Sequence, residues 1–249
     1  MKGENPGNRI SERGIMKDFK RIGLWVCAVL AGASAHAQVV LTYEYSGINS
    51  GIPDGDLSGW SDTRTVTTPH TSILSVSVTL TLEGTGGGAF NGDYYAYLSH
   101  EGTLAVLLNR VGVTDSNAFG YEDNGFANLT FRDDAANGDI HLYQGVVVPS
   151  GSGSLTGIWA PDGRNVSPLS VTDTTPRTAT LGELTGLNPN GEWTLFIADA
   201  SGGGTARLTD WSMNIVVAAV PEPETYAAVG GALLVGFAVV RRWRAAQKA

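Results

Sequence analysis

ILSVSVTLTL, the stretch at Ile73–Leu82, decides the fold class because its polarity changes at almost every step. From Leu74 onward every second residue is apolar, and the residues between are serine or threonine. A period of two is that of a β-strand with one buried and one solvated face. The stretch therefore predicts a half-buried strand whose outer face is polar.

The same alternation recurs in shorter segments along the chain, separated by glycine-rich turns such as 84–88 and 202–204. These segments are Leu104–Leu108, Leu129–Phe131, Ile140–Leu142, Trp193–Ile197 and Trp211–Val217. No helical period is sustained between the two ends of the chain. Many short strands joined by turns predict an all-β fold, a two-sheet β-sandwich or jelly roll. Trp193 and Trp211 each begin an apolar row, so we expect both in the core.

The charge of the chain is concentrated in its central body. The 249 residues carry a net charge of −8, but residues 38–220 contain six arginines, no lysine and 19 acidic residues, so 6 − 19 = −13. So acidic a body excludes nucleic acid and anionic membrane surfaces as electrostatic partners. The one cysteine, Cys27, precedes this body, which therefore has neither disulfides nor thiolate metal sites.

The N-terminal segment is typical of a secretory signal peptide over residues 1–37. From Met16 the chain reads a basic cluster, an apolar run over 22–33, and then Ala35-His36-Ala37. This order predicts export and cleavage by signal peptidase before Gln38, with Ala35 and Ala37 as the recognition residues. Residues 1–15 are polar and resemble an over-extended start.

The C-terminal segment, 219–249, has three parts: a proline-rich motif over 220–225, an apolar helix over 226–240 and a basic tail over 241–249. Fifteen apolar residues are fewer than the ~20 that span a bilayer, although flanking side chains extend the reach. The arginines predict that the C-terminus stays inside. They are Arg241, Arg242 and Arg244.

This tail resembles the PEP-CTERM sorting signal, with Pro221-Glu222-Pro223 at the family's namesake triplet. The resemblance implies that an exosortase-type peptidase of a Gram-negative bacterium cuts near the triplet. The body would then reach the cell surface or the exopolysaccharide matrix. The alternative is an ordinary membrane anchor that stays uncut.

The body, residues 38–218, resembles the P domain (P/Homo B domain) that follows the catalytic domain of proprotein-convertase-type subtilases. The resemblance extends from Gly51 to Val216, and its most specific blocks are GEWTLFIAD at 191–199 and WSMNI at 211–215. It implies a jelly roll of the galactose-binding-like kind, and it invites a protease label by inheritance.

The catalytic inventory argues against an enzyme. We expect the three histidines of the body, His70, His100 and His141, to be solvated surface residues. The segment Gly151–Leu155 departs from the Gly-x-Ser-x-Gly pattern of a hydrolase. We therefore expect a non-catalytic binding or scaffolding module. The alternatives are a glycan- or peptide-acting hydrolase that uses two carboxylates, or an accessory module of a subtilisin-like endopeptidase.

Two further expectations concern ligands. Tyr95 and Tyr97 share one strand face, where they either stack on sugar rings or pack across the sheet. Acidic residues follow strands or turns, so strand ends would bring them together as oxygen ligands for calcium, which the P-domain resemblance also implies. The candidate ligands are Asp93, Asp133, Asp134 and Asp199, with Asp54 and Asp56 as a weaker second set. The alternative is that these are solvated turn residues.

Overall fold

The computed structural model describes residues 38–149, 153–219 and 223–247 of the chain. The predicted signal peptide, with Ala35 and Ala37, lies outside the described residues. So do Pro221 and Glu222 of the sorting motif.

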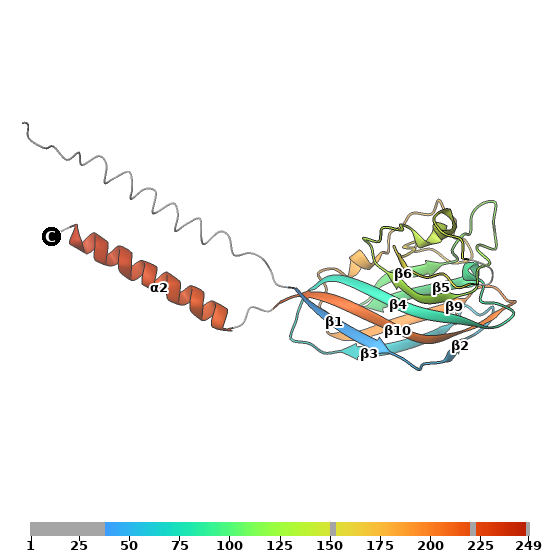
Figure 1. The fold of residues 1–249 in the computed structure, drawn as a ribbon, viewed down its shortest axis with the longest axis horizontal. Coiled ribbons are helices and arrows are strands. Elements are labelled where there is room, and N and C mark those ends of the chain that lie inside the picture. Colours follow the sequence, from blue (N-terminus) through green and yellow to red (C-terminus); the bar gives the residue numbers. More distant parts are fainter. Residues whose placement is uncertain (1–37, 150–152, 220–222, 248–249) are drawn as a thin grey trace, which may run out of the picture. The chain divides into compact units, whose positions relative to one another are not determined.

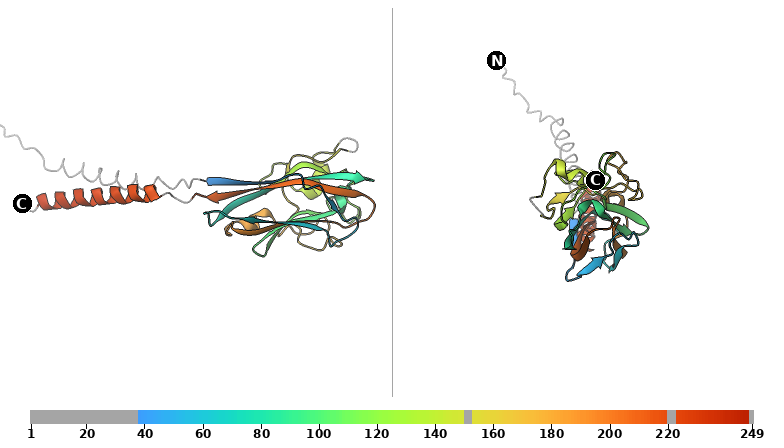
Figure 2. Two further views of the ribbon diagram at one scale, coloured as in Figure 1. Left: turned by 90° about the horizontal axis from the view of Figure 1, so that it is seen from below. Right: turned by 90° about the vertical axis from the view of Figure 1, so that its right-hand side faces the viewer.

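The body is an all-β sandwich of two sheets, which Figure 2 (left) shows as two layers. The six-stranded sheet has the order β1-β10-β4-β7-β8, with β2 also paired to β10. Its strands are β1 (Gln38–Tyr45), β2 (Ser50–Ile52), β4 (Ile73–Gly86), β7 (Phe126–Phe131), β8 (Ile158–Trp159) and β10 (Thr205–Ala218). The four-stranded sheet has the order β3-β9-β5-β6. Its strands are β3 (Trp60–Val66), β5 (Tyr94–His100), β6 (Thr103–Asn109) and β9 (Gly191–Asp199).

The core lies between the sheets, where the alternating residues of the long strands meet. In β4 the side chains of Val78, Leu80 and Leu82 are buried, whereas the threonines between them are partly exposed. Trp193 and Trp211 are both buried, which confirms that they belong to the core. The alternation thus reflects one face packed on the opposite sheet and one face in water.

Strand β6, the edge strand of the four-stranded sheet, departs from simple alternation. Five consecutive residues, Ala105–Asn109, are buried. The segment that follows β8 lies along β6: the amide of Asp162 donates to the carbonyl of Leu107, and the amide of Val106 to the carbonyl of Ala179. This long connection (Figure 1) therefore lies along the outer edge of the four-stranded sheet, where β6 would otherwise be unpaired.

The prediction of a strand at Ile140–Leu142 is wrong. These residues begin the 3₁₀ helix η2 (Ile140–Gly145), and the amide of His141 donates a hydrogen bond to the capping side chain of Asp139. His141 is fully buried and Leu142 is 42% exposed, the reverse of the expected pattern. Two other 3₁₀ helices, η1 (Asn91–Asp93) and η3 (Leu181–Leu184), also contribute to the sites described below.

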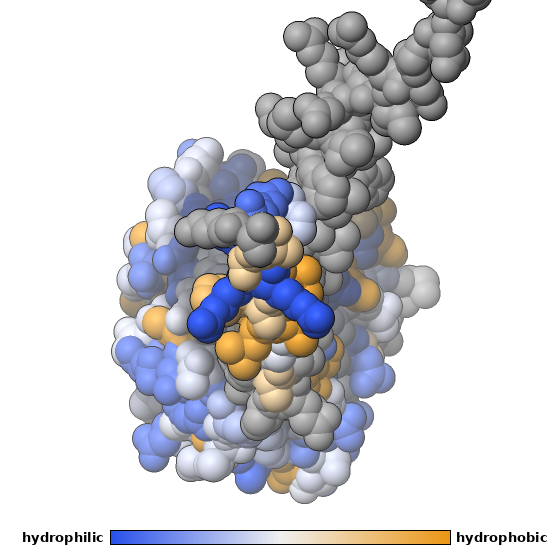
Figure 3. Space-filling model, turned by 90° about the vertical axis from the view of Figure 1, so that its left-hand side faces the viewer, coloured by the Kyte–Doolittle hydropathy of each residue, from blue (hydrophilic) through white to orange (hydrophobic). Residues whose placement is uncertain are grey.

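The predicted C-terminal helix lies within α2 (Pro223–Ala246). Proline suits the first position of a helix, because its missing amide has no partner there in any case. Large apolar side chains such as Leu234, Val235 and Phe237 are exposed on α2. Figure 3 shows one face of the molecule, on which hydrophobic and hydrophilic residues lie close together. In the part of the chain that the structure describes, no helix is both long and apolar enough to cross a membrane.

Candidate functional site

Two of the predicted calcium ligands, Asp93 and Asp199, form a buried acidic pair. Asp93 ends η1 immediately before β5, and Asp199 is the last residue of β9, paired in register with Tyr94. The two residues are 7% and 2% exposed. Asp199 accepts a hydrogen bond from the amide of Ser201, and Arg110 is the nearby cation. The turn of η1 is packed tightly, because a Cβ on Gly92 would lie 2.4 Å from the carbonyl oxygen of Phe119.

The pKa values of both carboxyls are raised. Burial and the charge of Asp199 raise the pKa of Asp93 to about 6, against the effect of Arg110. Burial and the charge of Asp54 raise the pKa of Asp199 to about 6, against the hydrogen bond from Ser201. At neutral pH the pair therefore carries charge at a cost in folding free energy.

The weaker candidates, Asp54 and Asp56, divide between two roles. Asp54 accepts a hydrogen bond from the amide of Gly203, which brings the turn after β2 next to the buried pair. Asp56 is exposed and accepts a hydrogen bond from the amide of Ser58, which lowers its pKa. Asp54 therefore joins the acidic pair, whereas Asp56 stabilises its own turn.

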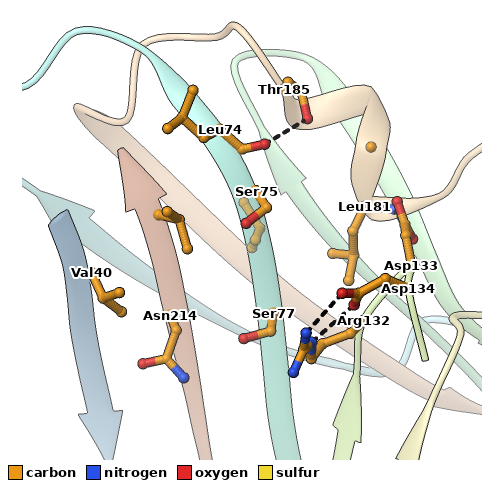
Figure 4. Close-up of a pocket in the computed structure, with 13 residues that line it drawn as sticks. Val40, Leu74, Ser75, Ser77, Arg132, Asp133, Asp134, Leu181, Thr185 and Asn214 are labelled. Atoms are coloured by element: carbon orange, nitrogen blue, oxygen red, sulfur yellow. Dashed lines mark hydrogen bonds and ion pairs between the residues drawn. The ribbon is translucent and has the colours of Figure 1, made fainter. Parts of the chain in front are cut away.

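Asp133 and Asp134 lie elsewhere, in a groove of about 640 Å³ between the outer face of the six-stranded sheet and η3 (Figure 4). Asp133 accepts hydrogen bonds from the amide of Leu181 and the hydroxyl of Thr180 at the start of η3. Asp134 forms an exposed ion pair with Arg132, at 2.8 Å. The structure therefore does not bring these two carboxylates to the Asp93–Asp199 pair.

The predicted set of four ligands is thus divided. Among the described residues, no group of three or more His, Cys, Asp or Glu side chains could hold a metal ion. The two desolvated carboxyls of Asp93 and Asp199 would by themselves supply only part of the six to eight oxygen ligands that calcium takes.

A second buried charge cluster surrounds His141 and corrects the expectation that this histidine is solvated. Its Nδ1 lies 2.7 Å from Asp162 Oδ2, and its Nε2 lies 2.9 Å from the carbonyl oxygen of Val113. Arg164 joins Asp162 to Asp139. Because both ring nitrogens are engaged and the ring is fully buried, His141 has no nitrogen with which to take a proton from a substrate. The histidine and aspartate pair is structural.

His100 is also buried, contrary to expectation. As the last residue of β5 it stacks on Trp193, with ring centroids 4.0 Å apart. Its two ring nitrogens lie 2.8 Å and 2.6 Å from the carbonyl oxygens of Glu192 and Asn188. Of the three histidines, only His70 keeps partial exposure, and its Nδ1 lies 2.9 Å from the carbonyl oxygen of Ala218.

Tyr95 and Tyr97 lie on the outer face of the four-stranded sheet, where they pack across it against Phe196 of β9. The rings of Tyr97 and Phe196 are stacked at 4.8 Å, and Tyr95 is tilted against Tyr97 and meets Phe196 edge to face. Beside Tyr97, a groove of about 510 Å³ lies between the β5–β6 turn and the start of β9. We call the three rings the aromatic strip and the cavity the β5–β9 groove.

No family model and no curated protein matches the chain. Among solved structures, the chain is similar to the crystal structure of the Aeromonas sobria serine protease (ASP) and chaperone (ORF2) complex, with 14% sequence identity and a TM-score of 0.41. The match covers 78% of this chain and 29% of that chain, so the chain spans less than a third of the length of the protein it matches.

Proposed function

We propose that this protein is an exported, non-catalytic β-sandwich module of the bacterial envelope or exopolysaccharide matrix that acts by binding or scaffolding. The observation that carries the proposal is the arrangement of the chain: an acidic, cysteine-free sandwich follows a signal-like segment and precedes a PEP-like motif, an apolar helix and arginines. Such a chain is built for delivery outside the cytoplasm.

The fold detail that we propose is a P-domain-like jelly roll. In support, the GEWTLFIAD block forms the second strand of the four-stranded sheet, with Trp193 in the core. The hydrolase alternative has less support, because the described carboxylates with raised pKa values, Asp93 and Asp199, are buried beside each other. They do not flank a groove in the way that glycosidase carboxylates do.

Processing at both ends tests the proposal. Protein released from the surface of the producing bacterium should begin near Gln38 and lack Arg241, Arg242 and Arg244. Signal peptidase would remove the N-terminal signal peptide, and an exosortase-type peptidase would remove the C-terminal sorting signal. Intact-mass measurement gives both ends at once. Replacing Pro221-Glu222-Pro223 with alanines should leave the C-terminal arginines attached. Recovery of parent protein that keeps both the segment before Gln38 and the C-terminal arginines would contradict the proposal.

We also propose that calcium binds at the Asp93–Asp199 pair, with Asp54 beside it. Without a cation, the two carboxyls have folded pKa values of about 6 against an ordinary 3.8. Between these values the folded state binds more protons than the unfolded state, so stability falls as the pH rises from ~4 to ~6. After discounting for solvent screening, each carboxyl costs about 1–2 kcal/mol at neutral pH. A divalent cation would remove this cost.

Asp93→Asn is expected to stabilise the calcium-free protein and to abolish its response to calcium. At neutral pH and in excess EDTA, the variant should be more stable than the parent by about 1–2 kcal/mol, because the repulsion is gone. Calcium should raise the melting temperature of the parent but not that of the variant. Thermal melts in EDTA and in calcium measure both effects, and Asp134→Asn, at an exposed ion pair, is the matched control. A parent that does not respond to calcium, or a variant that responds equally, removes the pair as a calcium site.

A further inference from the structure

The aromatic strip has no role in the core that would explain its three rings. Tyr95, Tyr97 and Phe196 are half-buried, and none of them belongs to the hydrophobic core or to the side chains packed against it. Phe196 also packs against Gly59, where a Cβ would lie 2.7 Å from its ring. Aromatic rings held in place on an outer sheet face offer apolar area at a low cost in side-chain entropy.

The β5–β9 groove continues the strip with polar groups. Tyr97 and Leu104 form the apolar wall of the groove. Its polar side chains come from the strands β5, β6 and β9 and from the turns next to them. The polar lining residues include Ser99, Glu101, Thr103, Asn190, Glu192 and Thr194. The side chains of Ser99, Glu101 and Glu192 make no hydrogen bond or ion pair with the residues that the structure describes. They are free to bind a ligand.

The charge of the groove selects the ligand class. Glu101 and Glu192 are its two charged residues, no lysine or arginine lines it, and both nitrogens of His100 are engaged by carbonyls. Across the body, five of the six arginines already form ion pairs with carboxylates. An anionic polymer would therefore be repelled, whereas a polymer with positive charges would be attracted.

We propose that the β5–β9 groove binds a polysaccharide whose sugars carry free amino groups. The apolar face of a sugar ring would lie against the edge of the aromatic strip at Tyr97, while the ammonium groups pair with Glu101 and Glu192 and the hydroxyls bond to Ser99 and Thr103. Ammonium groups are also attracted to aromatic faces. This inference rests on the proposed function as a matrix-binding module and names the ligand class of that module.

The test is calorimetric titration of the full-length chain with oligomers of equal length at mildly acidic pH, where the amines are charged. The panel contains glucosamine oligomers, their N-acetylated form, cello-oligosaccharides, oligogalacturonate and oligolysine. We expect the glucosamine oligomers to bind most tightly and to weaken as salt is added. Tyr97→Ala should weaken binding about tenfold, and Glu192→Gln about three- to fivefold. Glu183→Gln, at an exposed acid on η3, should leave it unchanged.

Each contrary result overturns the inference in a different way. Equal affinity for the N-acetylated oligomers would show that binding does not require the free amine. Equal affinity for oligolysine would show that binding does not require the sugar ring. Unchanged affinity in both Tyr97→Ala and the isosteric Glu192→Gln, with melting curves like the parent, would place binding outside the groove. None of these results affects the proposed function, which fails separately if the protein is neither exported nor processed.

Discussion

Replacing Arg164 with leucine is expected to lower the free energy of unfolding by about 3–5 kcal/mol. Arg164 is 3% exposed, and its guanidinium lies 2.9 Å from Asp139 and 3.3 Å from Asp162. Burial lowers its pKa, but the two carboxylates raise it further, so the net direction is upward and the side chain stays charged. Without it, the fully buried carboxylate of Asp162 keeps, among the described side chains, only the imidazole ring of His141 as a partner. Denaturant titration monitored by tryptophan fluorescence measures the loss.

The matched control is Arg132→Leu. Arg132 forms a similar ion pair with Asp134, at 2.8 Å, but both side chains are largely exposed. Exposed pairs contribute at most about 1 kcal/mol, so this variant should unfold close to the parent. Arg164→Lys, which keeps the charge but has no planar fork to join two carboxylates, should fall between them. Equal losses at Arg164 and Arg132 would contradict the assignment of the buried network as structural.

Truncating Trp193 to alanine should cost about 3–5 kcal/mol, a large part of a typical domain's ~5–15 kcal/mol. Trp193 is fully buried, stacks on His100 and donates a hydrogen bond from Nε1 to the carbonyl of Pro189. Its removal leaves a cavity, and it strips His100 of its stacking partner. We expect a similar cost for Trp211→Ala, because Trp211 packs on Tyr45 and donates to Asp62.

Phe119→Ala is the control for these two variants. Phe119 is the most exposed large hydrophobic side chain of the sandwich, at 72%. Its truncation should change stability by no more than about 0.5 kcal/mol. Equilibrium unfolding in urea gives all three values on one scale. A Trp193→Ala variant that unfolds at the same urea concentration as the parent would contradict the packing of β9 against the opposite sheet.

The long strands could be predicted because their pattern is local and repeated. In β4, β9 and β10 each buried residue is followed by a more exposed one over several steps, and the same rule that partitions side chains between core and water produces that pattern. The segment Ile140–Leu142, by contrast, contains only one apolar–polar–apolar alternation. One alternation cannot distinguish a strand from a 3₁₀ turn, and the side chain of Asp139 made it a turn.

The partners of the acidic residues could not be predicted from the sequence. Asp133 and Asp134 follow β7 as predicted, but their oxygens are taken by the start of η3 and by Arg132. Asp133 accepts a hydrogen bond from the start of η3, which lies far along the chain, and the sequence around Asp133 does not indicate that contact. Asp162 carried no motif at all, yet burial made it the centre of a charge network.

By itself, the amino-acid sequence determined the sheet class of this protein, the burial of Trp193 and Trp211, and the acidic character of its body, because periodicity and composition act residue by residue. Only the tertiary structure decided that Asp93 meets Asp199, that His141 meets Asp162, and that Tyr97 stacks on Phe196 beside Glu192. Each of these contacts joins distant segments, and its energy depends on desolvation and distance, which exist only once the two sheets have packed.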